Sequence, residues 1–197
     1  MLKDTLINNE YEARAMISES QYKEIYNHYS SINLRKRLVR NTNYYFDDDK
    51  GNIINSGMVL RLREINHQKY ELTLKIKEEN NDKEINLPTY VENIDEYLKN
   101  FKIDNEYIIE ELEKRNIDIK KIKYLTYLFT ERLEVKYRNF LLVIDKNEYN
   151  GIVDYNVEIE ARSREEAISI LNQKFSPFGV TYKKGYISKS RRAIFNL

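Results

Sequence analysis

The sequence of 197 residues contains no cysteine and no tryptophan, and it has few glycines and prolines. Without cysteine the chain cannot form disulfides, thiolate–zinc sites or a cysteine nucleophile, and it suits a reducing compartment. With five glycines and two prolines, it has neither the P-loop nor the dinucleotide-binding glycine pattern. No apolar run approaches the ~20 residues that span a membrane, and residues 1–17 lack a signal-peptide core. We therefore expect a cytoplasmic protein with no membrane partner.

Charge is abundant but balanced, with 33 Lys and Arg against 32 Asp and Glu. The net charge of +1 argues against a protein that binds nucleic acid through bulk charge, and it leaves room for a local basic patch. The 17 tyrosines could stack on RNA bases, but the spacing of many fits one face of a helix or strand, which favours packing. With 41% hydrophobic residues, the chain is predicted to form one globular domain over residues 1–197. Nothing in the sequence indicates an oligomeric state.

Hydrophobic periodicity predicts an antiparallel α+β domain. Helices are expected from Ser18, after Pro88, over about residues 104–116, and from Ser163. Period-2 alternation or a weaker form of it predicts eight strands, at residues 10–17, 40–47, 58–65, 70–77, 131–137, 140–145, 152–161 and 181–192. The short connection between 58–65 and 70–77 predicts a hairpin.

The polar faces of these strands carry like charges two residues apart. Glu10 and Glu12 form one such pair, Glu158 and Glu160 form a second, and Arg61 and Arg63 form a basic pair. A half-exposed sheet could carry such charges in solvent, but like charges on one face repel unless something neutralises them. Carboxylates suit Mg²⁺ or Mn²⁺, and guanidinium groups suit phosphate oxygens. The pattern therefore favours a site for hard cations together with an oxyanion.

The order of these charged stations resembles the CYTH domain, or triphosphate tunnel metalloenzyme, superfamily, and most closely its small stand-alone bacterial members. The resemblance spans residues 10–192 and rests on motifs in this order: Glu10-Tyr11-Glu12-Ala13-Arg14, Arg61-Leu62-Arg63, Leu72-Thr73-Leu74-Lys75, Arg132, Leu142-Val143-Ile144-Asp145, Glu158-Ile159-Glu160 and Ser188-Lys189-Ser190-Arg191. Arg14 stands where the family signature has lysine, which keeps the charge and changes its shape and reach.

The resemblance implies a closed eight-stranded antiparallel β-barrel with helices packed outside and a charged lumen. It implies that Mg²⁺ or Mn²⁺ is bound by the carboxylates Glu10, Glu12, Asp145, Glu158 and Glu160. It implies that phosphate groups are bound by the cations Arg14, Arg61, Arg63, Lys75, Arg132 and Lys189. No protein nucleophile is implied, since a water activated by the cation would attack the phosphorus.

The resemblance leaves three functions open. The first is a metal-dependent hydrolase of small triphosphate compounds, such as inorganic triphosphate, thiamine triphosphate or a nucleoside triphosphate. The second is an adenylate cyclase of class IV type, which would need a base-recognition pocket that the sequence does not reveal. The third is a non-catalytic module that binds polyphosphate or nucleotide. The full set of five carboxylates favours the hydrolase, because an anion binder would gain nothing from them.

Overall fold

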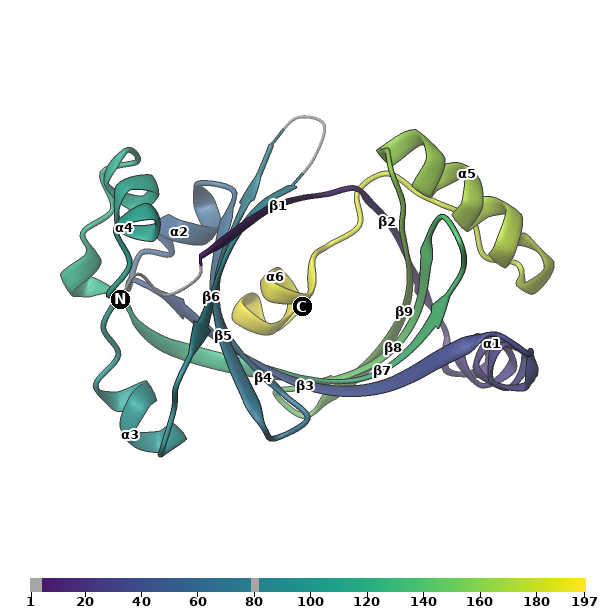
Figure 1. The fold of residues 1–197 in the computed structure, drawn as a ribbon, viewed down its shortest axis with the longest axis horizontal. Coiled ribbons are helices and arrows are strands. Elements are labelled where there is room, and N and C mark those ends of the chain that lie inside the picture. Colours follow the sequence, from purple (N-terminus) through teal and green to yellow (C-terminus); the bar gives the residue numbers. More distant parts are fainter. Residues whose placement is uncertain (1–4, 79–81) are drawn as a thin grey trace. The chain divides into compact units, whose positions relative to one another are not determined.

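The computed structural model describes residues 5–78 and 82–197 (Figure 1). The chain forms two compact units, and each is described by itself. One comprises the described part of residues 1–9, 42–128 and 189–197, and the other comprises residues 10–41 and 129–188. Two long strands, β3 (Arg35–Asp47) and β7 (Lys123–Lys136), contribute residues to both units.

The unit of residues 10–41 and 129–188 is an antiparallel sheet with helices on its apolar face. Its strands follow the order β7, β8, β9, β2, and Figure 1 shows β7, β8 and β9 side by side. Its elements, besides parts of β3 and β7, are β2 (Glu12–Ile17), α1 (Glu19–Ser31), β8 (Leu141–Tyr149), β9 (Ile152–Glu160), α5 (Arg164–Phe175) and the short helix η2 (Ser176–Phe178). Asn150 and Gly151 both have positive φ, which suits the two-residue turn that joins β8 to β9.

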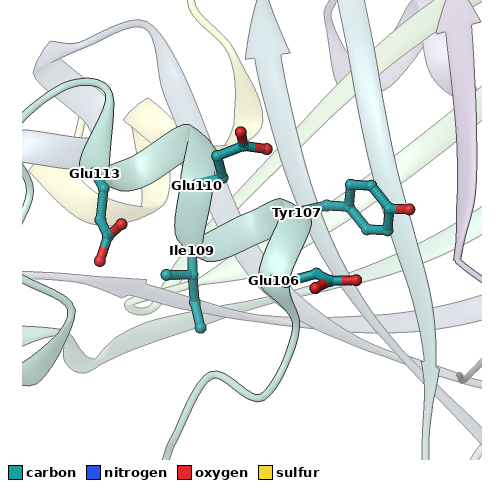
Figure 2. A pocket seen from close by; sticks show the side chains of 5 residues that line it. All are labelled: Glu106, Tyr107, Ile109, Glu110 and Glu113. Atoms are coloured by element: carbon teal, nitrogen blue, oxygen red, sulfur yellow. The ribbon is translucent and has the colours of Figure 1, made fainter.

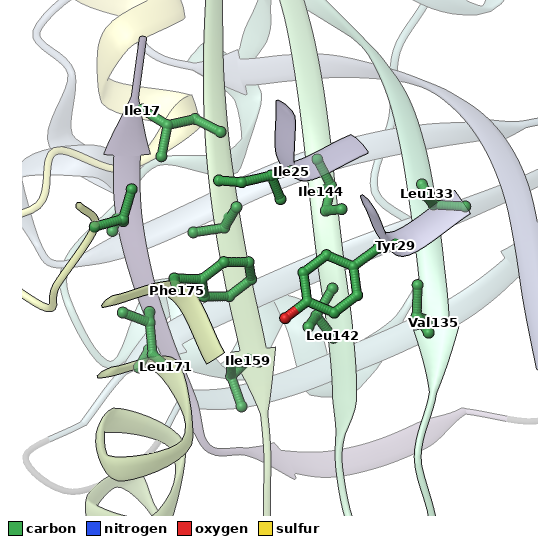
Figure 3. Close-up of a cluster of buried hydrophobic side chains, with 14 of the residues drawn as sticks. Ile17, Ile25, Tyr29, Leu133, Val135, Leu142, Ile144, Ile159, Leu171 and Phe175 are labelled. Atoms are coloured by element: carbon green, nitrogen blue, oxygen red, sulfur yellow. The ribbon is translucent and has the colours of Figure 1, made fainter. Parts of the chain in front are cut away.

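The core of this unit lies between the sheet and helices α1 and α5. Figure 3 shows Tyr29 of α1 and Phe175 of α5 against side chains from the strands, including Leu142 and Ile159. Alternation along each strand buries these apolar residues on one face and leaves the other face for polar residues. The tyrosine hydroxyl donates to the carbonyl oxygen of Lys174 at 3.1 Å, so its polar end is satisfied beside the core.

The second unit contains a meander of three antiparallel strands and several short helices. Its elements, besides parts of β3 and β7, are β1 (Leu6–Glu10, whose last residue falls in the other unit), α2 (Asn52–Asn55), β4 (Met58–Ile65), β5 (Lys69–Lys77), β6 (Asp82–Thr89), α3 (Ile94–Lys99), α4 (Glu106–Glu113), η1 (Ile119–Lys121) and α6 (Lys189–Phe195). The predicted hairpin is confirmed, because β4 pairs with β5 so that Leu60 lies opposite Leu74. These leucines share a buried cluster with Ile108 and Leu112 of α4.

The antiparallel α+β class is confirmed, but the closed barrel of eight strands is not. The described strands number nine and follow the hydrogen-bonded order β1-β6-β5-β4-β3-β7-β8-β9-β2, which has two ends. The strand predicted at 10–17 is divided at Tyr11 into β1 and β2, and β6 was not predicted. The strand predicted at 181–192 is wrong: no strand occurs there, and Lys189–Phe195 form helix α6.

Two of the predicted helix starts are confirmed by their caps. Ser18 accepts a hydrogen bond from the backbone of Gln21 and Ser163 from that of Glu166, so both cap their helices as the spacing predicts. The start predicted after Pro88 is wrong by several residues. Asn93 is the cap of α3, and Thr89 ends strand β6 instead.

Candidate functional site

The unit of residues 10–41 and 129–188 gathers all five predicted carboxylates into one group. We call it the acidic cluster, and it consists of Glu10, Glu12, Arg14, Arg132, Asp145, Glu158 and Glu160. Strand register brings its members together, since Arg14 lies opposite Glu158, and Arg132 lies opposite Asp145. Directly opposite residues in an antiparallel pair share one face of the sheet. The contacts therefore follow from the alternation that the sequence shows.

Arg132 is the centre of the acidic cluster. Its guanidinium donates to both oxygens of Asp145, from Nε at 2.8 Å and from Nη2 at 3.0 Å. Nη2 also donates to Oε2 of Glu158 at 2.9 Å, and Nη1 lies 3.9 Å from Oε1 of Glu160. Burial alone would lower the pKa of Arg132, but the surrounding carboxylates outweigh it and raise that pKa well above its ordinary value. Arg132 thus stays charged and fixes the directions of the carboxylates around it.

Arg14 provides the second positive charge. It forms an ion pair with Glu12, and its Nε lies 3.1 Å from Oε1 of Glu158. The ring of Tyr186 lies over the guanidinium, with its centroid 5.9 Å from the central carbon, as in a cation–π contact. A planar guanidinium can contact two carboxylates and an aromatic ring at once, which the compact ammonium of a lysine does less well.

The acidic cluster carries more negative than positive charge. Its five carboxylates face two guanidinium groups, which leaves an excess of three negative charges when all are ionised. Burial and the charges of Glu158, Glu10 and Glu12 raise the pKa of Glu160 to about 7, although Arg132 opposes the shift. Glu160 therefore lies among negative neighbours in the folded protein.

The chemistry of the donor set fits a hard divalent cation. Carboxylate oxygens are the ligands that Mg²⁺ and Mn²⁺ prefer, and an added cation would offset the excess negative charge. Within residues 5–78 and 82–197, no three acidic or histidine side chains converge closely enough to hold an ion as they stand. The reason is geometric: Arg14 and Arg132 engage the oxygens of Glu12, Asp145 and Glu158.

The other unit holds a second charged group, which we call the cationic cluster: Arg61, Arg63, Lys75 and Glu84. Glu84 on β6 lies opposite Lys75 on β5. Its Oε1 lies 3.5 Å from Nη2 of Arg61 and 3.3 Å from Nζ of Lys75. Burial would raise the pKa of Glu84, but the three cations outweigh it and lower that pKa to about 2. Two cations thus converge on one anionic oxygen.

Two predicted cations of this unit, Arg63 of the cationic cluster and Lys189 outside it, differ in their surroundings. Arg63 donates from Nε to Oδ1 of Asn43 at 3.0 Å, which fixes its side chain. Lys189 is the first residue of helix α6 and does not lie on a strand as predicted. The predicted site residues thus fall into two sets, one in each unit, and their roles stay predictions.

Sequence reasoning missed two buried polar residues, Glu84 within the cationic cluster and Asn156 beside the acidic cluster. Glu84 belongs to β6, a strand whose alternation is confined to a few residues between a charged stretch and Pro88. Asn156 lies on the predicted polar face of β9, but it was not predicted as a site residue because its side chain carries no charge. Its amide contacts Asp145 and Glu158. The alternation on strand 152–161 was the signal that could have found it.

A pocket of about 420 Å³ lies on helix α4, and none of the predicted site residues lines it (Figure 2). Its lining consists of Glu106, Tyr107, Ile109, Glu110 and Glu113. Three carboxylates and no cationic side chain line it, so it would repel a triphosphate. We assign no function to this pocket.

Comparison with known proteins shows the family. The chain belongs to the CYTH domain family, whose model matches residues 8–187. It is 30% identical over 173 residues to YjbK of Bacillus subtilis (strain 168), which is provisionally named a triphosphatase; the match covers 85% of this chain and 86% of that protein.

Two solved structures show the same fold. A protein from Bacillus halodurans, provisionally named an adenylate cyclase, superposes with a TM-score of 0.80 at 23% identity, covering 94% of this chain and 97% of that one. HpAC1 from Hippeastrum, an adenylyl cyclase candidate described as having a dominant triphosphatase activity, gives a TM-score of 0.75 at 18% identity, covering 95% and 96%. At these identities the likeness concerns the fold alone. Among the helices described within residues 5–78 and 82–197, none is both long and apolar enough to span a membrane.

Proposed function

We propose that this protein is a divalent-metal-dependent hydrolase of small compounds that carry a triphosphate. The observation that carries the proposal is the acidic cluster, in which five carboxylates gather around Arg14 and Arg132 on one face of the sheet. Membership of the CYTH family and the triphosphatase name of the YjbK relative support the same activity.

In this proposal the carboxylates of the acidic cluster hold Mg²⁺ or Mn²⁺: Glu10, Glu12, Asp145, Glu158 and Glu160. When bound, such an ion neutralises phosphate oxygens and polarises the attacking water. Arg132 keeps Asp145 and Glu158 turned toward one another, because its Nη2 donates to both. Once the added ion engages these carboxylates, Arg14 and Arg132 can donate to phosphate oxygens instead.

The cationic cluster supplies the proposed phosphate contacts in the other unit. Arg61 and Lys75 already converge on a single carboxylate oxygen of Glu84, which shows that they can share one anionic oxygen. A phosphate oxygen has the same charge character and accepts the same charged hydrogen bonds. We propose that Arg63 and Lys189 contribute further phosphate contacts, as the family motif implies.

The substrate is tested by measuring phosphate release from inorganic triphosphate, ATP and thiamine triphosphate, each with Mg²⁺ and with Mn²⁺. The proposal expects release from at least one of them, with no cyclic AMP formed from ATP. Formation of cyclic AMP with release of diphosphate would assign a cyclase instead. Binding without turnover of any of the three would assign the non-catalytic module.

A further inference from the structure

A chain of buried side-chain amides lies directly behind the acidic cluster. Asn156 and Asn147, on the neighbouring strands β9 and β8, are both fully buried. Asn156 donates from Nδ2 to Oδ2 of Asp145 at 3.2 Å and to Oε1 of Glu158 at 3.1 Å. Its Oδ1 accepts a hydrogen bond from Nδ2 of Asn147 at 2.8 Å. Every hydrogen-bonding direction of this amide except one lone pair is therefore used.

The chain continues away from the acidic cluster. The second hydrogen of Asn147 Nδ2 goes to Oδ1 of Asp154 at 2.9 Å, and Asn147 Oδ1 accepts from the hydroxyl of Thr130 at 2.9 Å. The hydroxyl of Tyr149 donates to the other oxygen of Asp154 at 2.8 Å. Both asparagines are thus held by partners on three strands, β7, β8 and β9.

The carboxylates at the two ends dictate how both amides are turned. An ionised carboxylate only accepts hydrogen bonds, so Asn156 must present its NH₂ group to Asp145 and Glu158. Its oxygen then faces Asn147, which must donate in turn. Reversal of either amide would set oxygen against oxygen in a buried place, which is costly. The arrangement therefore has one direction only.

We propose that Asn156, oriented by Asn147, is a positioning residue that presets Asp145 and Glu158 for cation binding. This inference rests on the proposed function, in which these two residues belong to the metal-binding carboxylates. They are the two most buried members of the acidic cluster, and the same amide ties them together. Hydrogen bonds from a second layer of residues orient metal ligands, and their loss typically lowers metal affinity about 10–100-fold.

The test is Mn²⁺ binding to the full-length protein without substrate, measured by calorimetry and by the electron paramagnetic resonance signal of free Mn²⁺. Asn156→Ala should raise the dissociation constant of Mn²⁺ by about 10–100-fold. Thr130→Val is the matched control. It also removes a buried hydrogen bond from this series of linked side chains, but Thr130 contacts neither Asp145 nor Glu158 through a hydrogen bond. Both variants should melt at a lower temperature, and only Asn156→Ala should lose metal affinity.

Each outcome decides the proposal. An affinity of Asn156→Ala within about twofold of the parent, or an equal loss in Thr130→Val, would overturn the positioning role and leave the hydrolase proposal standing. If the parent itself did not bind Mn²⁺, both the inference and the metal-dependent function would fall. Should Asn156→Ala not fold, Asn147→Ala removes the group that orients Asn156 and should still raise the dissociation constant more than Thr130→Val does; equal values would overturn the inference.

Discussion

Buried charges in this protein are stabilised by several partners each. Glu158 is 1% exposed, and it lies between two guanidinium groups and accepts from an amide. Removing one partner of such a group leaves a buried charge uncompensated, which is strongly destabilising. Glu160 differs, because it is partly exposed and Arg132 opposes the negative charges of several neighbours there. The two glutamates of one motif therefore have opposite effects on stability.

Because the pKa of Glu160 is raised, we expect Glu160→Gln to increase the free energy of unfolding in the absence of metal, by an amount that depends on pH. The folded state binds this proton up to pH about 7, whereas the unfolded state releases it near 4.5. The parent therefore loses stability as pH rises through this window, and glutamine does not. Because Glu160 is 37% exposed, solvent screens part of the effect.

Urea unfolding in EDTA should show the variant more stable than the parent at pH 8 and equal to it at pH 4. A variant less stable than the parent at pH 8 would show that Glu160 is a paired charge, contrary to the charge excess of the acidic cluster.

For Glu84 we expect the opposite dependence of stability on pH, because the pKa of this residue is lowered to about 2. Its ionised form is favoured in the folded state, so its stabilising effect is complete above pH 4.5 and is lost as pH falls toward 2. Glu84→Gln should therefore be less stable than the parent at pH 7, by about 1.4 kcal/mol for each unit of pKa shift. The two proteins should converge near pH 2 in urea titrations. If the difference in free energy of unfolding between parent and variant stayed constant from pH 7 to pH 2, the loss of stability would come from the changed shape of the side chain and not from its charge.

The elements show which sequence signals are reliable. Strands such as β4 and β9 alternate over eight or nine residues and were predicted nearly to their ends. Strand β6 was missed because only Ile85 and Leu87 mark its apolar side, and its pairing with β5 supplies what the local pattern lacks. Residues 181–192 were misjudged because five cations and scattered apolar residues fit a strand and a helix equally well.

The site residues, like the strands, could be predicted where alternation is regular and not elsewhere. Charged residues on well-alternating strands, such as Arg132 and Glu158, could be assigned to one face from the sequence. Their ion pairs could not, since strand register and side-chain direction decide them. A neutral residue such as Asn156 could not be predicted as part of the site. Its role depends on the carboxylates that its amide contacts, and the sequence does not show those contacts.

Helix α5 offers a test of the capping interpretation. Ser163→Ala removes the side chain that accepts from the backbone of Glu166, and it should lower the free energy of unfolding by about 0.5–2 kcal/mol. Ser169→Ala, at an exposed position inside the same helix, is the control and should be neutral or slightly stabilising. Equal effects in urea unfolding would contradict a specific role for the Ser163 hydroxyl.

At the scale of the molecule, a nearly neutral chain carries two groups of buried or half-buried charges on the polar faces of its strands. The acidic cluster gathers five carboxylates around two guanidinium groups, while the cationic cluster surrounds Glu84 with three positive side chains. In the proposed function these two groups of charges, and not the net charge of +1, bind the phosphate oxygens and divalent ions.

Replacement of a cation tests whether affinity depends on particular positions. Arg61→Ala should weaken binding of a non-hydrolysable triphosphate by about 1.5–3 kcal/mol, the range for a charged hydrogen bond. Lys114→Ala is the control, since the Lys114 side chain is about half exposed and its ammonium pairs with Glu110 and Glu111 on helix α4. Calorimetric titration in the presence of metal measures both. An equal loss in the two variants would mean that general charge, not the cationic cluster, binds the triphosphate.

The central claim, that carboxylates of the acidic cluster hold a divalent ion needed for triphosphate hydrolysis, is tested most directly by removing and restoring metal. Phosphate release from inorganic triphosphate is followed in Mn²⁺, after excess EDTA, and after Mn²⁺ is added back, for the parent and for Glu158→Gln. We expect the parent to lose activity in EDTA and to regain it with Mn²⁺, and we expect the folded variant to stay inactive throughout. Hydrolysis that continues in EDTA, or that survives in Glu158→Gln, would contradict the account.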